Sequence, residues 1–255
     1  MIQNISGDSS NVMDFTLHKY EELIQSLQAY GFESLTLRHD VDKLPGNSLR
    51  TARIEAAMGM KGIYYFRAVP ESWEEAVIRE IAALGHEIGY HYESLTTCNG
   101  DVDVAYADFC QNLERLRAVA TVRSICMHGS PRSPYDSRDI WKKYDYRTLG
   151  IENEPYLDTD FSKTFYLTDT GRRWDGWKVS VRDKIPRYQD EWAAQGLIFH
   201  TTDDLLEGLR REILPKNLMI TFHPQRWNPF GFRWCKEAII QPVKNTVKRI
   251  IIKKR

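Results

Sequence analysis

Short apolar segments alternate with longer amphipathic ones along most of this chain of 255 residues. The apolar segments have the length and the β-branched and aromatic residues of strands; they are 34–40, 61–69, 86–92, 121–129 and 217–224. The amphipathic segments have helical spacing and several end at glycine; they are 15–30, 48–59, 71–85, 101–118 and 201–214. Strands that alternate with helices predict a parallel sheet covered by helices.

The length and composition fit one α/β domain, either a barrel or a doubly wound sheet. Residues 130–195 lack this regular pattern, and we expect long loops there with a short strand at 164–170. The formal net charge is zero, which argues against a nucleic-acid-binding surface over the whole molecule. We see neither a secretory signal nor a membrane-spanning apolar run, so we expect a cytoplasmic protein.

Four polar clusters follow predicted strands: RHDVD at 38–42, GYHYE at 89–93, MHGSPRSPYD at 127–136 and TFHPQRW at 221–227. In parallel α/β barrels the loops at the carboxyl ends of the strands meet at one rim, where the active site lies. Five of the seven histidines lie in or beside these strands; they are His39, His86, His91, His128 and His223. The sequence therefore predicts an Asp/His site at this rim.

Asp40 and Asp42 are two residues apart, so in an extended strand their carboxylates share a face. Such a pair repels unless a cation lies between them or one group is protonated. One hypothesis makes them a general base and a metal ligand, and the alternative makes them caps of the following helix. The other three clusters favour the first hypothesis.

His91 ends the third strand and Glu93 lies two residues later, and an imidazole and a carboxylate are both common zinc ligands. A rim histidine bonded to a neighbouring loop is the alternative for His91. His86 begins the same strand, so we expect it at the opposite end, in a structural role.

His128 and His223 end apolar strands, and each precedes a proline by one to three residues. A histidine titrates near neutral pH and suits proton delivery to a leaving group. We expect His223 to be the acid and keep His128 as an alternative metal ligand or oxyanion donor. The alternative for both is a hydrogen bond that supports other site residues.

Taken together, these motifs resemble the polysaccharide deacetylase superfamily (carbohydrate esterase family 4 and relatives) over about residues 34–224. The resemblance implies an irregular (β/α) barrel with fewer than eight strands. It implies that Asp40 of RHDVD is the catalytic base and Asp42 a metal ligand. It also implies that His91 of GHEIGYH is a metal ligand and that His223 of ITFHP is the general acid.

The chain departs from the family pattern at Leu95, where the family has a second metal histidine. Either Glu93 or His128 then completes the site, or the metal is weak or absent. Some relatives in the family, allantoinase-like amidases among them, lack the usual metal triad. Zinc is the expected ion. The third family motif supplies an arginine before a Pro-Tyr pair, which Arg132 and Tyr135 resemble, although His128 occupies the strand end.

Aromatic side chains on the rim loops are candidates for stacking on sugar rings; they are Tyr135, Trp174, Trp177 and Trp227. With Arg132, we take Tyr135 and Trp227 as substrate-binding candidates. Loop packing is the alternative for each aromatic residue.

Residues 231–255 follow the expected barrel domain of residues 1–230 and are rich in basic residues, whereas the rest of the chain is mildly acidic. Apolar residues recur there at helical spacing with lysines between them, which predicts a basic amphipathic helix. We favour a helix that packs its apolar stripe on the barrel. Peripheral attachment to an anionic membrane at its inner face is the alternative.

These patterns favour a metal-dependent hydrolase that removes acyl groups, expected to be N-acetyl groups, from a glycan or glycan precursor. Two alternatives remain open: a metal-independent amidase on the same barrel, and a sugar-binding or scaffold protein without turnover. We expect an acylated carbohydrate as partner and no nucleic acid.

Overall fold

The computed structural model describes residues 13–130, 133–178, 180 and 182–253. Within them the chain forms one parallel sheet whose strands lie in the order β4-β3-β2-β1-β6-β5. The strands are β1 Ser34–Val41, β2 Ile63–Phe66, β3 Glu87–Tyr92, β4 Val122–Met127, β5 Phe165–Thr168 and β6 Asn217–Phe222. The strand pattern predicted from the sequence is confirmed, including the short strand at 164–170.

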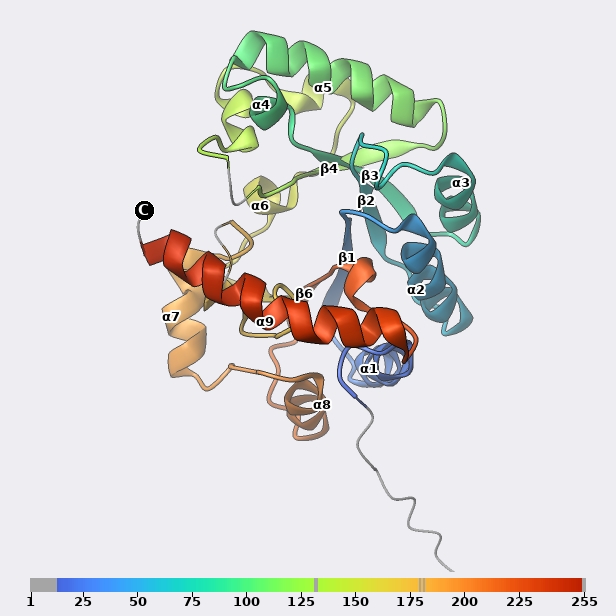
Figure 1. The fold of residues 1–255 in the computed structure, drawn as a ribbon, viewed down its shortest axis with the longest axis vertical. Coiled ribbons are helices and arrows are strands. Elements are labelled where there is room, and N and C mark those ends of the chain that lie inside the picture. The colour runs from blue at the N-terminus through green and yellow to red at the C-terminus, as the bar shows by residue number, and fades with distance from the viewer. Residues whose placement is uncertain (1–12, 131–132, 179, 181, 254–255) are drawn as a thin grey trace, which may run out of the picture.

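The helices surround the sheet, as Figure 1 shows. They are α1 Leu17–Ala29, α2 Pro45–Ala57, α3 Glu75–Ala83, α4 Ser94–Thr97, α5 Val102–Arg117, α6 Pro155–Asp158, α7 Pro186–Ala194, α8 Thr202–Arg210 and α9 Phe232–Lys253. The helices expected between strands are all present. The sequence pattern missed α6 and α7, which lie in the stretch expected to be loops.

Side chains alternate between the two faces of the strands. On β1 to β4 one set is apolar and packs against α2, α3 and α5, as Val41, Phe66 and Ile88 do in one continuous buried cluster. The alternate set, which includes Arg38 and His91, is buried as well but polar. The apolar face therefore builds the core with the helices, and the polar face builds the site.

The two edges of the sheet are joined through side chains. Beyond β4, Asn153 forms a parallel bridge with Ser124. Tyr156 follows this bridge and Tyr166 lies on β5 at the other edge, and their hydroxyls are 3.5 Å apart. Both hydroxyls also donate to Asp183. The sheet is therefore curled in a barrel-like manner, with side chains rather than backbone closing the gap.

The long final helix α9 crosses the front of the molecule in Figure 1. It contacts loops that follow strand ends: Asn245 donates to the carbonyl of Gly171, and Glu237 lies 3.7 Å from Lys43. Residues 171 and 43 follow β5 and β1, so α9 lies at the carboxyl ends of the strands. Within the described residues, no helix is both long and apolar enough to cross a bilayer.

Candidate active site

The curl of the sheet brings together polar residues from four strand ends. Asp40 is the second last residue of β1 and Asp42 follows the strand. His91 lies on β3, His128 follows β4 and His223 follows β6. All five border one cavity of about 150 Å³, together with the inward-facing Arg38. The rim predicted from the sequence is therefore a real cluster.

Three ligand atoms converge at this rim. Asp42 Oδ1 lies 3.6 Å from His91 Nε2 and 3.4 Å from His128 Nε2. The other oxygen of Asp42 accepts from the side-chain amide of Gln225. Oδ1 is buried and, among the described residues, has no hydrogen-bond partner. All three ligand atoms lie within 4.8 Å of one another, so the group can hold a metal ion.

Each histidine is held through its other ring nitrogen. His91 Nδ1 lies 2.9 Å from the carbonyl oxygen of Cys126, which can only accept, so Nδ1 carries the proton. His128 Nδ1 lies 3.0 Å from a carboxylate oxygen of Glu93. In the neutral form of either ring, Nε2 then carries the lone pair, and this atom faces Asp42. Metal-binding histidines are oriented in this way by a carbonyl or carboxylate behind them.

Glu93 lies behind His128 rather than in the ligand group. Its Oε1 accepts two bonds from Arg67, at 2.9 and 2.6 Å, while Oε2 faces His128. Burial alone would raise the pKa of Glu93, but His128 and Arg67 lower it to about 2. Both oxygens are thus occupied. The structure places His128, and not Glu93, as the third ligand candidate.

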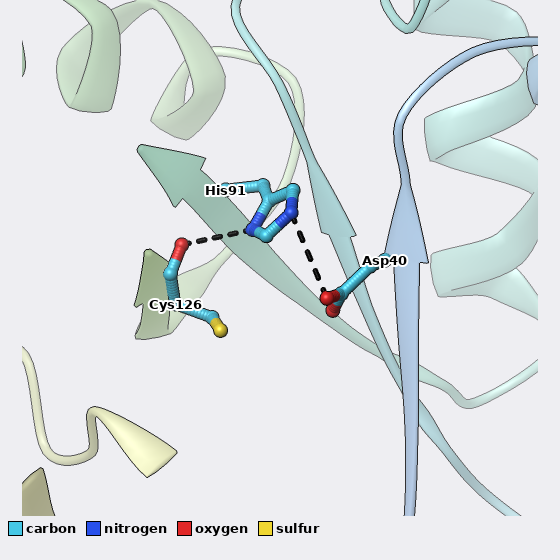
Figure 2. Close-up of side chains that lie close together, drawn as sticks. All are labelled: Asp40, His91 and Cys126. Carbon is cyan, nitrogen blue, oxygen red and sulfur yellow. Dashed lines mark hydrogen bonds and ion pairs between the residues drawn. The ribbon is translucent and has the colours of Figure 1, made fainter. Parts of the chain in front are cut away.

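A second group, Asp40, His91 and Cys126, also has metal-ligand spacing. Figure 2 shows His91 of β3 between the Asp40 carboxylate of β1 and the backbone carbonyl of Cys126 on β4. Two observations weaken this group as a metal site. Asp40 is already paired through both oxygens with Arg38. Burial raises the pKa of the Cys126 thiol well above its usual value, which disfavours the thiolate that binds metals.

Asp40 is well placed to act on a group bound next to the metal candidates. Its carboxylate is buried and accepts from Arg38 at 2.8 and 2.6 Å, and Oδ2 lies 3.7 Å from His91 Nε2. Burial would lower the pKa of Arg38, but the Asp40 charge raises it well above its usual value. This ion pair fixes the direction of the carboxylate and leaves it bordering the cavity.

His223 forms a dyad with Asp169, a residue that the sequence reasoning missed. His223 Nδ1 lies 2.6 Å from Asp169 Oδ1, and the His223 backbone amide donates to Oδ2. Burial and Arg226 act to lower the pKa of His223, but Asp169 raises it overall. Asp169 directly follows β5. Asp169 could have been predicted as a site residue, because it follows the short strand in the same way as the other site residues follow theirs.

Asp183 is the second residue that the sequence reasoning missed. It borders the cavity and accepts from Thr168 at 2.5 Å and from Thr170, Tyr156 and Tyr166. Burial would raise the pKa of Asp183, but positive charge nearby and these hydroxyls lower it to about 2. An ionised carboxylate therefore lies in the cavity wall. It lies in a stretch without strand or helix periodicity, so the sequence carried no signal for it.

Two of the aromatic candidates, Trp174 and Trp227, are buried. Trp227 is fully buried against Phe15, and its indole N–H donates to Asp169. It therefore supports the His223 dyad and is shielded from any sugar. Tyr135 is 38% exposed and its ring lies against Gly100. Trp174 is buried in the core. Arg132 lies outside the described residues.

Two further expectations concern residues outside the site. Leu95 packs in a small apolar cluster with Ala105 and Ile140, so its side chain serves packing. His86 is buried before the start of β3, where Nε2 lies 2.9 Å from the carbonyl of Ala52. The structural role expected for His86 is confirmed.

No protein-family model and no curated protein matches this chain.

Proposed function

We propose that this chain is a metal-dependent hydrolase that removes acyl groups, N-acetyl groups in the first place, from a glycan or glycan precursor. The observation that carries the proposal is the convergence of Asp42, His91 and His128 next to the Arg38-paired carboxylate of Asp40. The order of Asp40, Asp42 and His91 along the chain also resembles that of the polysaccharide deacetylase motifs. We therefore propose that the curled sheet is an irregular (β/α) barrel of that type.

The proposed metal ligands are Asp42, His91 and His128. Two imidazoles and one carboxylate form a ligand set that divalent zinc accepts, with room for substrate or water in a catalytic site. The buried, unpaired Oδ1 of Asp42 supports this assignment, because a carboxylate oxygen left without a partner is costly unless a cation or donor joins it. His128 takes the place of the family histidine that Leu95 replaces.

A divalent cation bound there supplies Lewis acidity, which polarises an acyl carbonyl and lowers the pKa of water. Asp40 accepts a proton from the attacking water, since its carboxylate borders the cavity beside His91. Arg38 holds that carboxylate in place. His223 delivers a proton to the departing amine, and Asp169 orients its ring and stabilises its charged form.

The cavity restricts what can enter. Its volume of about 150 Å³ is small beside the roughly 300–1,000 Å³ of pockets that enclose a larger ligand. We infer that a small acyl group enters and that the sugar ring stays at the mouth. The wall is polar, with Asp183 and Tyr156 on one side, which favours a small polar acyl group such as acetyl over a long apolar one.

Leu95 favoured the metal-independent alternative, because it stands where the family has its second metal-binding histidine. The position of His128 supplies an imidazole from a different strand end. The geometry therefore favours the metal-dependent reaction.

The test compares Asp40→Asn with wild type on N-acetylated oligosaccharides, with acetate release as the readout. We expect kcat to fall by about 10²- to 10⁴-fold, the usual contribution of a general base. Asp190→Asn, an exposed position on α7, is the matched control and should keep wild-type activity. Equal turnover by Asp40→Asn and wild type would overturn the assignment of the base.

A further inference from the structure

Helix α9 is amphipathic, but its polar face packs on the protein and its apolar face is exposed, the reverse of an ordinary surface helix. Residues of the polar face contact the body of the protein: Gln241 is buried, and Asn245 donates to the carbonyl of Gly171 at 2.9 Å. Trp234 also lies on the inner side, where its indole N–H donates to the carbonyl of Asp14. The sequence-based expectation that α9 packs its apolar stripe on the barrel is therefore wrong.

The apolar residues of α9 lie on its outer face. Phe232, Ile239, Val243 and Val247 each leave 51–84% of their surface exposed. Their spacings of seven, four and four residues place them on one side of the helix. Phe230, just before the helix, is exposed as well. Single exposed apolar residues are ordinary, but a continuous stripe on one face marks an interaction surface.

The same segment is basic. Arg233, Lys236 and Lys244 are exposed on α9. The sequence from 236 to 255 contains seven basic residues and one acidic residue, Glu237, whereas the whole chain carries 35 of each sign. Glu237 lies 3.7 Å from Lys43. An exposed apolar stripe within a locally basic segment matches the chemistry of an anionic lipid surface, where apolar side chains insert and lysines meet headgroups.

A second copy of this chain fits the surface less well. Pairing two α9 helices through their apolar stripes would bring two basic segments together, and like charges at an interface repel. An anionic bilayer satisfies both the stripe and the charge.

We propose that the outer face of α9 docks on an anionic lipid bilayer, with Phe232, Ile239, Val243 and Val247 inserted at headgroup level. This docking surface stands on its own observations. One consequence rests on the proposed function: because α9 packs on loops that follow β1 and β5, docking holds the rim of the candidate site near the membrane. The glycan substrate would then be a lipid-anchored one.

The test is sedimentation of the full chain with vesicles of equimolar phosphatidylglycerol and phosphatidylcholine, compared with pure phosphatidylcholine. We expect binding to the anionic vesicles and a marked loss at high salt. The variant Ile239→Glu/Val243→Glu should lower the partition coefficient by at least about tenfold. The matched control, Val104→Glu/Ile213→Glu, changes an exposed valine and an exposed isoleucine away from α9 and should bind like wild type.

Three results would overturn the proposal: no binding of wild type to anionic vesicles, undiminished binding by Ile239→Glu/Val243→Glu, or a wild-type dimer that this variant converts to a monomer. The last result would assign the stripe to a second copy. Acetate release from a soluble substrate is measured in parallel. Because the substituted side chains point away from the cavity, their effect on docking can be separated from a failure of the proposed hydrolase activity.

Discussion

The candidate site depends, at the scale of single residues, on which ring nitrogen of each histidine is free. The carbonyl of Cys126 holds Nδ1 of His91, and the carboxylate of Glu93 holds Nδ1 of His128. Sequence spacing cannot reveal these partners, because they come from a different strand or from a side chain whose direction is set by Arg67. For this reason His128, an alternative ligand on sequence grounds, is the third ligand candidate, and Glu93, expected to be a ligand, lies behind it.

Glu93→Gln should weaken metal binding without removing a ligand. An amide is a poorer acceptor than a carboxylate for the Nδ1 proton of His128, so the ring loses basicity and orientation. We expect the dissociation constant for Zn²⁺ to rise about 10- to 100-fold, measured by competition with a chromophoric chelator. Glu87→Gln, at the exposed start of β3, is the control and should bind like wild type. Unchanged affinity in Glu93→Gln would contradict this role.

Asp169→Asn should shift the pH profile of hydrolysis. The Asp169 charge raises the pKa of His223, and as general acid His223 must be protonated, so activity falls when the pH exceeds that pKa. Removing the charge lowers the pKa of His223. The alkaline limb of kcat/KM should therefore move to lower pH. An alkaline limb that stays in place would show that His223 is not the acid.

At the scale of elements, the strands were predictable because each combines an apolar face with turn residues at its end. The same pattern located Asp40, Asp42, His91, His128 and His223, since a strand end fixes where its last side chains lie. Asp183 was not predicted, because its place in the site depends on hydrogen bonds from the hydroxyls of Thr168 and Thr170. These contacts form only when the chain folds, and sequence spacing does not indicate them. The sequence also did not predict which face of α9 packs on the protein. Periodicity shows that a helix has an apolar stripe, but it does not show whether that stripe faces the protein.

Gly89 allows the central strands to pack at the inner face. A Cβ added there would overlap the ring of Tyr65 and lie 3.1 Å from the carbonyl oxygen of Ser124. We expect Gly89→Ala to destabilise the protein by about 1–3 kcal/mol, measured by urea denaturation. Gly46→Ala, in α2 with open space around it, should instead be neutral or stabilise by up to about 1 kcal/mol. Equal stability of the two variants would argue against close packing at Gly89.

At the scale of the whole molecule, the proposed metal joins residues that lie far apart in the sequence. Its ligands follow or lie on β1, β3 and β4, so an ion there binds the folded chain and not the unfolded one. Zn²⁺ at a hundred times its dissociation constant should stabilise the fold by about 2.7 kcal/mol. That corresponds to a rise in Tm of several degrees, on the order of 2–4 °C per kcal/mol, in thermal unfolding with and without chelator.

His128→Ala should remove most of this thermal shift while leaving the metal-free Tm close to that of the metal-free wild type. The imidazole borders the cavity and is partly exposed, so its loss opens little core. A full zinc-dependent shift in His128→Ala would mean that the ion binds elsewhere.

The central claim is that Asp42, His91 and His128, rather than the group containing Cys126, hold one divalent ion. Metal content by plasma mass spectrometry, after exposure to Zn²⁺ and removal of free metal, tests it most directly. We expect about one equivalent in wild type and in Cys126→Ala, and a large loss in Asp42→Asn. Less than about a tenth of an equivalent in wild type, or a metal content that falls in Cys126→Ala and persists in Asp42→Asn, would contradict it.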